Sequence, residues 1–240
     1  MRRRVAETVA VSGFSAFLVA LKLCEYLSFH VDDFDTGIYS NVVWNVANGA
    51  GFYSDVLRTH HLGEHFSPIM AVFAPLYAFA PSALWLLVAQ ALAVGATFAL
   101  LMRVFERIGS SVADVAGHWF APGCLALFLC YRPMWSALYH DFHPSTLGMP
   151  LVAGALLCLH SGSRRGLWIC VALLLATKEL AVATTLGLAL YAVAVLGERR
   201  VGMALASVSA LAAIAVFGGV MPAFRDGPWE HMARGGPPGA

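Results

Sequence analysis

Residues able to do chemistry concentrate in a polar stretch from residue 32 to residue 68, which is rich in carboxylates and histidines. Asp35 stands near its start, in the motif F-D-T-G-I-Y. A carboxylate there could accept a proton from a hydroxyl group or bind a divalent metal ion. Asp is also a favoured residue for capping the first turn of a helix, so an N-cap role is the alternative.

A second acidic motif, Asp141-Phe-His143, lies much further along the chain. A carboxylate and an imidazole two residues apart suit a borderline divalent ion such as Mn²⁺ or Zn²⁺. The alternative is a plain junction between a loop and a helix that begins at Pro144, since proline is favoured at the first helical position.

Histidines are densest in the run H-H-L-G-E-H at residues 60–65. Its last five residues match the H-x-x-E-H pattern of inverted zinc peptidases. That mechanism needs a stable helix, and Gly63 with Pro68 just beyond argues against one. We therefore predict that His61, Glu64 and His65 line a substrate pocket, with ordinary interfacial side chains as the alternative.

Lys178-Glu179 interrupts an otherwise apolar run. An ionisable pair in a membrane segment is a functional candidate by default, although the two charges could simply neutralise each other. A lysine at the floor of an outward-facing cavity could hold a lipid phosphate as a point charge. Arg225 follows the last apolar run on the same face and joins the predicted substrate-binding residues.

Apolar helices must position these residues. Hydrophobic residues make up 59% of the 240 residues and charged residues 12%, well outside the range of soluble globular proteins. Apolar runs long enough to cross ~30 Å of hydrocarbon recur along the chain. The sequence therefore predicts an all-α, polytopic helical membrane protein. A net charge of +1 and the lack of a basic, aromatic-interleaved patch give no sign of nucleic-acid binding.

We expect about seven transmembrane helices, over residues 5–29, 82–105, 112–131, 146–160, 167–177, 180–196 and 201–224. Residues 66–80 are apolar but short and bracketed by prolines, which favours an interfacial or re-entrant helix. Within a first outer loop at residues 30–68, helical spacing of apolar residues predicts a short interfacial helix that ends at Asn48-Gly49. Residues 1–224 then form one transmembrane module, and residues 225–240, rich in Gly and Pro, form a flexible extracytoplasmic tail.

Arginine clusters orient the predicted helices. With seven spans, all of these clusters fall on one side, which the positive-inside rule makes cytoplasmic: Arg2, Arg3, Arg4, Arg103, Arg107, Arg164, Arg165, Arg199 and Arg200. The N-terminus is then cytoplasmic, and the carboxylates and histidines lie on the outer face of the inner membrane. Residues 167–177 reach only ~17 Å, so one long helix over residues 167–196 is an alternative.

Four motifs occur in an order and spacing that resemble the bacterial membrane proteins called domain of unknown function 2079. They are F-D-T-G-I-Y-S-N-V-V-W-N, H-F-S-P-I-M-A-V-F-A-P-L-Y, D-F-H-P and T-K-E, and the resemblance covers roughly residues 30–225. That family is grouped with the GT-C superfamily of integral-membrane glycosyltransferases, which use polyprenyl-phosphate-linked sugars. Family members usually continue past the seventh span, so this chain is expected to be a truncated or minimal N-terminal module.

The resemblance implies roles for particular residues. In the GT-C superfamily, one acidic residue lies in the first outer loop, and a second acidic motif in the next outer loop contributes to a metal site. Asp35 matches the first position, and Asp141 with His143 matches the second. The implied cofactor is a divalent metal ion (Mn²⁺, Mg²⁺ or Zn²⁺) held by these three residues.

The sequence together with the resemblance thus predicts a GT-C-like inverting glycosyltransferase whose partners are membrane lipid and a polyprenyl-phosphate sugar. Asp35 would be the catalytic base or a metal ligand, and Lys178 and Glu179 would act near the departing phosphate. A transporter with Lys178-Glu179 as its central site is one alternative, although the inner half of the chain offers few ionisable residues. A non-catalytic membrane scaffold is the other.

Overall fold

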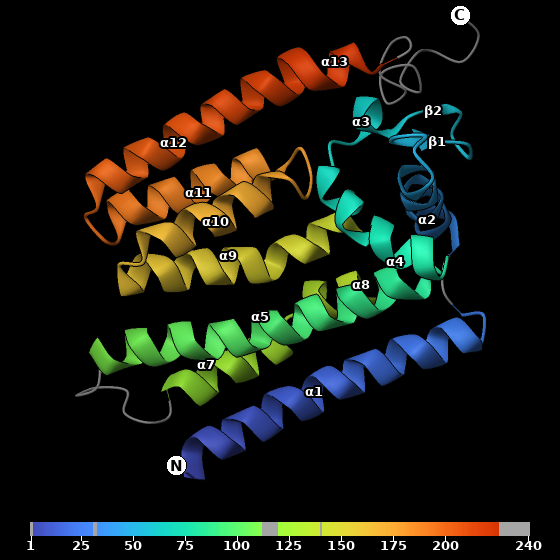
Figure 1. Ribbon diagram of the computed structural model, residues 1–240. Coiled ribbons are helices and arrows are strands. Elements are labelled where there is room, and N and C mark those ends of the chain that lie inside the picture. Colours follow the sequence, from blue (N-terminus) through green and yellow to red (C-terminus); the bar gives the residue numbers. More distant parts are fainter. Residues whose placement is uncertain (1, 31–32, 112–119, 140, 226–240) are drawn as a thin grey trace, which may run out of the picture.

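The computed structural model describes residues 2–30, 33–111, 120–139 and 141–225, and most of them are helical (Figure 1). The elements in chain order are α1 (Arg2–Leu27), α2 (Asp33–Ala47), β1 (Tyr53–Ser54), β2 (Thr59–His60), α3 (His61–Glu64), η1 (Pro68–Phe73), α4 (Ala74–Phe79), α5 (Leu84–Ser111), α7 (Phe120–Leu129), α8 (Arg132–Tyr139), α9 (Pro144–Ser161), α10 (Arg164–Leu175), α11 (Ala181–Ala194), α12 (Arg199–Ala213), η3 (Ile214–Val220) and α13 (Met221–Ala223). The predicted all-α class is confirmed, apart from one two-residue antiparallel pairing of β1 with β2.

Among the described residues, four helices are long and apolar enough to cross a membrane: Thr8–Leu27, Leu84–Gly109, Pro144–Ser161 and Arg199–Ala223. They coincide with four of the seven predicted spans. The other three correspond to shorter helices: α7 has 10 described residues, α10 has 12 and α11 has 14. Residues 112–119, where the third predicted span begins, lie outside the described residues, as do residues 226–240 of the predicted tail. A count of seven spans therefore stays a prediction.

The long helices lie side by side, and the chain passes back and forth along them (Figure 1). The turn from α9 to α10 and the turn from α11 to α12 lie at the same end of the bundle as the N-terminus. Arg164 in the first turn donates a 2.8 Å hydrogen bond to Glu198 in the second. Since α10 and α11 are separate helices, one continuous helix over residues 167–196 is excluded and the predicted division into two helices is confirmed. That each of the two crosses the membrane stays a prediction.

Small residues allow α9 to α12 to pack closely. Their shared core consists mainly of Ala, Leu and Val side chains. Gly202 faces α11 so tightly that a Cβ atom there would lie 2.8 Å from the carbonyl oxygen of Ala189. Close backbone approach at small residues is a common way for helices to associate in a membrane, where lipid is as apolar as the helices themselves.

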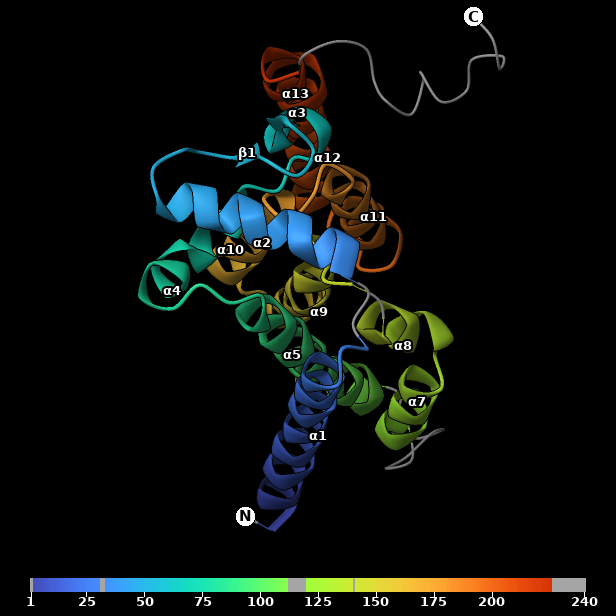
Figure 2. The same ribbon diagram turned by 90° about the vertical axis from the view of Figure 1, so that its right-hand side faces the viewer.

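Helix α2 lies across the ends of the long helices at the opposite end from the arginine-rich turns (Figure 2). Its buried face carries Ile38, Tyr39, Val42 and Val43, which pack at helical spacing against the bundle. The helix ends at Ala47, and Gly49 follows in the left-handed region with φ of 80°. A helix over this stretch was predicted from the same spacing.

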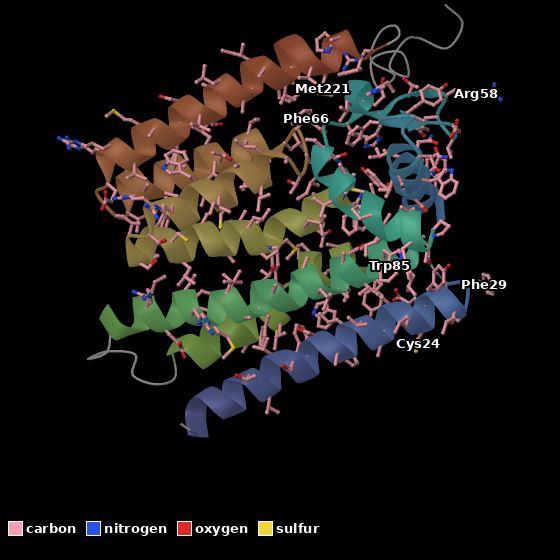
Figure 3. The ribbon with its side chains drawn as sticks, viewed as in Figure 1. Cys24, Phe29, Arg58, Phe66, Trp85 and Met221 are labelled. Carbon is pink, nitrogen blue, oxygen red and sulfur yellow. The ribbon has the colours of Figure 1, made fainter. Side chains whose placement is uncertain are left out.

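The predicted interfacial or re-entrant stretch at residues 66–80 is also helical, as a 3₁₀ turn (η1) that continues into α4. Side-chain nitrogen and oxygen atoms gather toward the two ends of the long helices, whereas carbon dominates between them (Figure 3). The short elements α2, α3, β1, β2 and η1 lie at one of these polar ends, and α2 and α3 carry Asp35, His61 and Glu64 there.

Candidate functional site

Asp141 joins the loop before α9 to the first turn of α2. Its Oδ2 accepts a 2.8 Å hydrogen bond from the backbone N–H of Asp35, and its Oδ1 accepts one of 3.1 Å from the Thr36 hydroxyl. The Thr36 hydroxyl in turn accepts a 3.0 Å bond from the backbone N–H of Phe142. A carboxylate at a helix N-terminus is favoured by the unpaired N–H groups and by the helix dipole. The two motifs predicted to converge are thus in direct contact.

Asp35 is therefore not the N-cap of α2, because the helix begins at Asp33 and Asp141 supplies the capping carboxylate from a distant loop. The Asp35 carboxylate is left facing His143, with 3.6 Å between its Oδ2 and the imidazole Nε2. Their side chains are 40% and 34% exposed, so both can be reached by a ligand.

The acceptor atoms at this end fit a divalent cation in part. Two ligands that each lie ~2.1 Å from a tetrahedral ion are about 3.4 Å apart, close to the separation of Asp35 Oδ2 and His143 Nε2. Both oxygens of Asp141 already accept hydrogen bonds, although each carboxylate oxygen has a second lone pair. No three His, Cys, Asp or Glu side chains in the described part of the chain are grouped closely enough to hold an ion between them.

His65 and Glu179 form a second cluster, which joins the first outer stretch to the turn between α10 and α11. Glu179 accepts a 3.1 Å hydrogen bond from the backbone N–H of Phe66, and its other oxygen lies 3.4 Å from His65 Nδ1. Burial alone would raise the pKa of the Glu179 carboxyl. Hydrogen bonding to His65 and to backbone N–H groups, with the nearby charges of His65 and Lys178, instead holds this pKa below its ordinary value.

His61 is completely buried between these clusters. Its Nε2 lies 2.8 Å from the Ser67 hydroxyl, while its buried Nδ1 has no hydrogen-bond partner among the described residues. Burial, followed by the charge that His65 can carry, lowers the pKa of His61 to about 3. The imidazole is therefore neutral at physiological pH. Because α3 is only four residues long, the prediction that no stable helix carries the H-x-x-E-H pattern is confirmed.

Arg225, just after α13, contacts α3 at the same end of the molecule. Its guanidinium donates a 2.8 Å hydrogen bond to the carbonyl oxygen of Gly63, and its Nε lies 4.0 Å from the Glu64 carboxylate. Phe224 stacks on His60 with ring centroids 4.1 Å apart. The last described residues therefore pack on the predicted substrate-binding residues rather than extending away from them.

Tyr39 links the two clusters, and the sequence did not mark it as functional. Its ring makes edge contacts with His61 at 5.3 Å and with His143 at 6.4 Å between centroids. Burial, followed by the neighbouring carboxylates of Asp35 and Glu179, raises the pKa of the Tyr39 phenol above its ordinary value. The phenol therefore stays neutral. An aromatic at helical spacing on an apolar face looks the same as a core residue in the sequence, so no signal there could have found it.

Lys178 is the remaining predicted site residue. It lies beside Glu179 in the turn between α10 and α11, half-buried, and its ammonium makes no hydrogen bond or ion pair with the described residues. The pair therefore does not neutralise itself by direct contact, since Glu179 is bonded to His65 and Phe66 instead. Beside Glu179, an apolar hollow of about 270 Å³ opens between η1, α10, α11 and η3.

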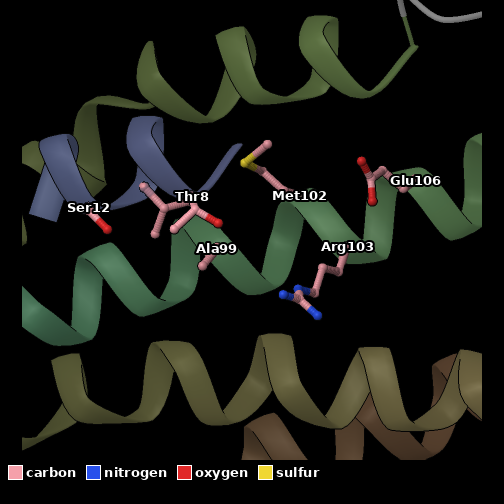
Figure 4. A pocket seen from close by; sticks show the side chains of 7 residues that line it. Thr8, Ser12, Ala99, Met102, Arg103 and Glu106 are labelled. Atoms are coloured by element: carbon pink, nitrogen blue, oxygen red, sulfur yellow. The ribbon is translucent and has the colours of Figure 1, made fainter. Parts of the chain in front are cut away.

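A different hollow, of about 460 Å³, lies between α1 and α5 toward the arginine-rich end (Figure 4). Arg103 and Glu106 on its rim point away from each other in this view. None of the four sequence motifs reaches this hollow. The polar end with α2 therefore remains the candidate site.

A family model described as "Predicted membrane protein (DUF2079)" matches residues 25–235, which is most of the chain. The chain belongs to this family. The match includes every residue of the two clusters, so the resemblance noted from the four motifs is confirmed at the level of the DUF2079 family.

Membership of the DUF2079 family shows a membrane protein with apolar helices, and a lipid environment follows from it. No curated protein and no solved structure matches the chain in the comparisons made. The relation of this DUF2079 protein to the GT-C superfamily therefore remains a prediction.

Proposed function

We propose that this protein is a GT-C-like inverting glycosyltransferase, or the N-terminal module of one, that uses a polyprenyl-phosphate-linked sugar at the outer face of the inner membrane. One observation carries the proposal. Asp35, Asp141 and His143, from motifs more than a hundred residues apart, meet at one end of the helices, beside a second cluster with a buried carboxylate and a lysine.

The Asp35 carboxylate acts as general base in this proposal. It is 40% exposed and not used as a helix cap, so an acceptor hydroxyl can reach it. The acceptor oxygen forms a bond to C1 of the donor sugar while its proton passes to Asp35. The bond between C1 and the phosphate oxygen breaks, and the polyprenyl phosphate leaves with the electron pair. One displacement of this kind inverts the configuration at C1.

Asp35 and His143 are the residues that would hold a divalent cation, with Asp141 as a further ligand through its remaining lone pairs. A bound cation supplies positive charge that stabilises the departing phosphate. Asp141 also orients the first turn of α2, because it accepts hydrogen bonds from Asp35 and Thr36. Its part in the reaction would thus be at least to position Asp35.

The second cluster suits the phosphate and lipid parts of the donor. Lys178 has no ion-pair partner among the described residues and can serve as a point charge for a phosphate. Glu179 is hydrogen-bonded to the Phe66 N–H and to His65, and it thereby holds the segment around α3 in place. The same segment contains His61 and Glu64, and Arg225 packs on it. The apolar hollow of about 270 Å³ next to Glu179 can take the first units of a prenyl chain.

The proposed topology has seven crossings, a cytoplasmic N-terminus and the two clusters outside. It rests on the separation of the arginine-rich turns from the polar end along the bundle (Figure 1). In a cysteine-free background, single cysteines at Ser163 and at Asp55 should react with an impermeant thiol reagent from opposite sides of the membrane. Labelling of both from the same side would refute the topology.

The activity test is transfer from a radiolabelled polyprenyl-phosphate sugar in membranes that contain wild type or one variant. Asp35→Asn should lower the transfer rate by about 10²–10⁴-fold, the range for loss of a general base. Lys178→Gln should lower it less, and Arg164→Gln, at the far end, should not change it. Equal rates for wild type and Asp35→Asn would remove the assignment.

A further inference from the structure

A groove of about 520 Å³ runs along the other face of α2, between the end of α1 and the start of α5. Volumes of roughly 300–1,000 Å³ are typical of small-molecule sites. The two clusters lie on the face of α2 that carries Asp35 and Tyr39. The groove lies on the face with Ser40, Asn41 and Trp44, and Thr36 marks the edge shared by the two.

The described side chains that line the groove are polar, aromatic or small, and none of them is charged. Trp44 is 43% exposed and Tyr26 is 37% exposed, so both present aromatic surface to a ligand. The exposed Asp55 carboxylate accepts a hydrogen bond from Asn41 at one edge of the groove. A purely apolar chain would leave the polar groups of the groove unpaired.

Several hydrogen-bonding groups in the groove remain available. The Trp44 indole N–H and the Tyr26 hydroxyl make no hydrogen bond with any described residue. Ser40 accepts a 3.0 Å bond from the Tyr77 hydroxyl, which leaves its own proton free to be donated. Asn41 is held rigidly, because it both donates to and accepts from Asp55 at 3.0 and 2.8 Å. The groove wall is therefore preformed.

A neutral saccharide has the matching chemistry. A pyranose ring offers an apolar C–H face that packs on an aromatic ring, and hydroxyl groups that both donate and accept hydrogen bonds. Aromatic side chains with a polar handle meet both needs at once. A neutral ligand is enough to match the described lining residues, which carry no charge.

We propose that this groove binds a neutral saccharide and is the acceptor subsite of the proposed transferase. The second part rests on the proposed function. Thr36 connects the groove to the first cluster, since its hydroxyl bonds Asp141 and belongs to the residue after Asp35. A saccharide in the groove would thus have one end next to the proposed base.

Saturation-transfer NMR on the whole protein in lipid nanodiscs, prepared without sugar detergents, tests the binding. The probes are methyl β-glucoside, methyl α-mannoside, N-acetylglucosamine, maltose and cellobiose. At least one should bind to wild type, and Trp44→Ala should weaken that binding about tenfold. Trp168→Ala is the matched control, because Trp168 is 37% exposed on α10 and away from the groove.

The outcomes separate the two proposals. Saccharide binding that depends on Trp44, not on Trp168, and persists in Asp35→Asn supports the groove even if no transfer is detected. Transfer activity that is lost in Asp35→Asn but unchanged in Trp44→Ala keeps the transferase and overturns the groove. Failure of all five probes to bind, or equal binding by the Trp44 variant, also overturns the groove proposal. Trp44 and Tyr26 would then be ordinary aromatic residues of the membrane interface.

Discussion

Replacing Asp141 with Asn should loosen the first turn of α2. Asp141 is only 7% exposed, and its carboxylate accepts hydrogen bonds from the Asp35 N–H and the Thr36 hydroxyl. An Asn side chain has nearly the same shape. It keeps one carbonyl oxygen for one of these donors and turns an N–H₂ group toward the other.

The expected loss follows from these contacts. A hydrogen bond to a charged group contributes ~1.5–3 kcal/mol, and a negative charge near a helix N-terminus contributes ~0.3–1 kcal/mol. Losing one such bond and the charge should lower the free energy of unfolding by about 2–3 kcal/mol. The loss should appear in SDS-induced unfolding followed by tryptophan fluorescence, and the Asp35 amide should exchange faster with deuterium.

Asp55→Asn is the matched control for Asp141→Asn. Asp55 also accepts two hydrogen bonds from α2, from Asn41 and Asn45, and these bonds hold the pKa of its carboxyl below the ordinary value. It is exposed to solvent, however, so its replacement should have the smaller effect on stability. If both variants unfold alike and amide exchange at Asp35 is unchanged, the capping role of Asp141 is wrong.

Two further predictions concern the wall around α3. His61 is neutral in the folded protein because its pKa is lowered to about 3, whereas an unfolded His takes up a proton below about 6.5. The stability that this neutral His61 contributes should therefore be fully present above pH ~6.5. It should fall as the pH drops toward 3, by up to about 1.4 kcal/mol per pH unit. The variant His61→Gln should show a smaller slope when unfolding is measured from pH 7.5 to 4.5. Gly63→Ala would place a Cβ atom 2.5 Å from the carbonyl oxygen of Phe224. The change should therefore separate α3 from α13 and destabilise the protein. Trypsin should then cleave the peptide bond after Arg225 faster than in the wild type. Gly187→Ala meets no atom within 4 Å and should be neutral or slightly stabilising in the same assays, and equal effects of the two changes would contradict the close contact.

Local patterns predicted much of the helical layout. The apolar spacing around Val42 and the Asn48-Gly49 pair together predicted α2 and its end, and both are determined within a few residues of sequence. Prolines around residues 66–80 likewise predicted a short helical stretch, which is present as η1 and α4. The break at Lys178-Glu179 predicted two helices, α10 and α11, because charged residues end an apolar run.

Contacts between residues far apart in the chain were harder to predict from the sequence. The meeting of Asp35 with Asp141 was expected from the family resemblance, but not that Asp141 would cap α2, which depends on how a loop 106 residues away is placed. The partner of Glu179 was also missed. Its neighbour Lys178 was the obvious candidate in sequence, yet the backbone N–H of Phe66 and the imidazole of His65 are the groups that reach it.

Helix α2 takes part in both the cluster around Asp35 and the groove. It lies across the ends of the bundle (Figure 2). Asp35 and Tyr39 on one face therefore reach the clusters, while Ser40 and Trp44 on another face line the groove. A helix parallel to the others would bury one face and give the other to lipid, where polar groups are costly. Positions 35 and 36 are about 100° apart on a helix, so substitutions on the two faces should act separately. The Asp141 contact is the exception, since it bonds to both residues and should affect both faces at once.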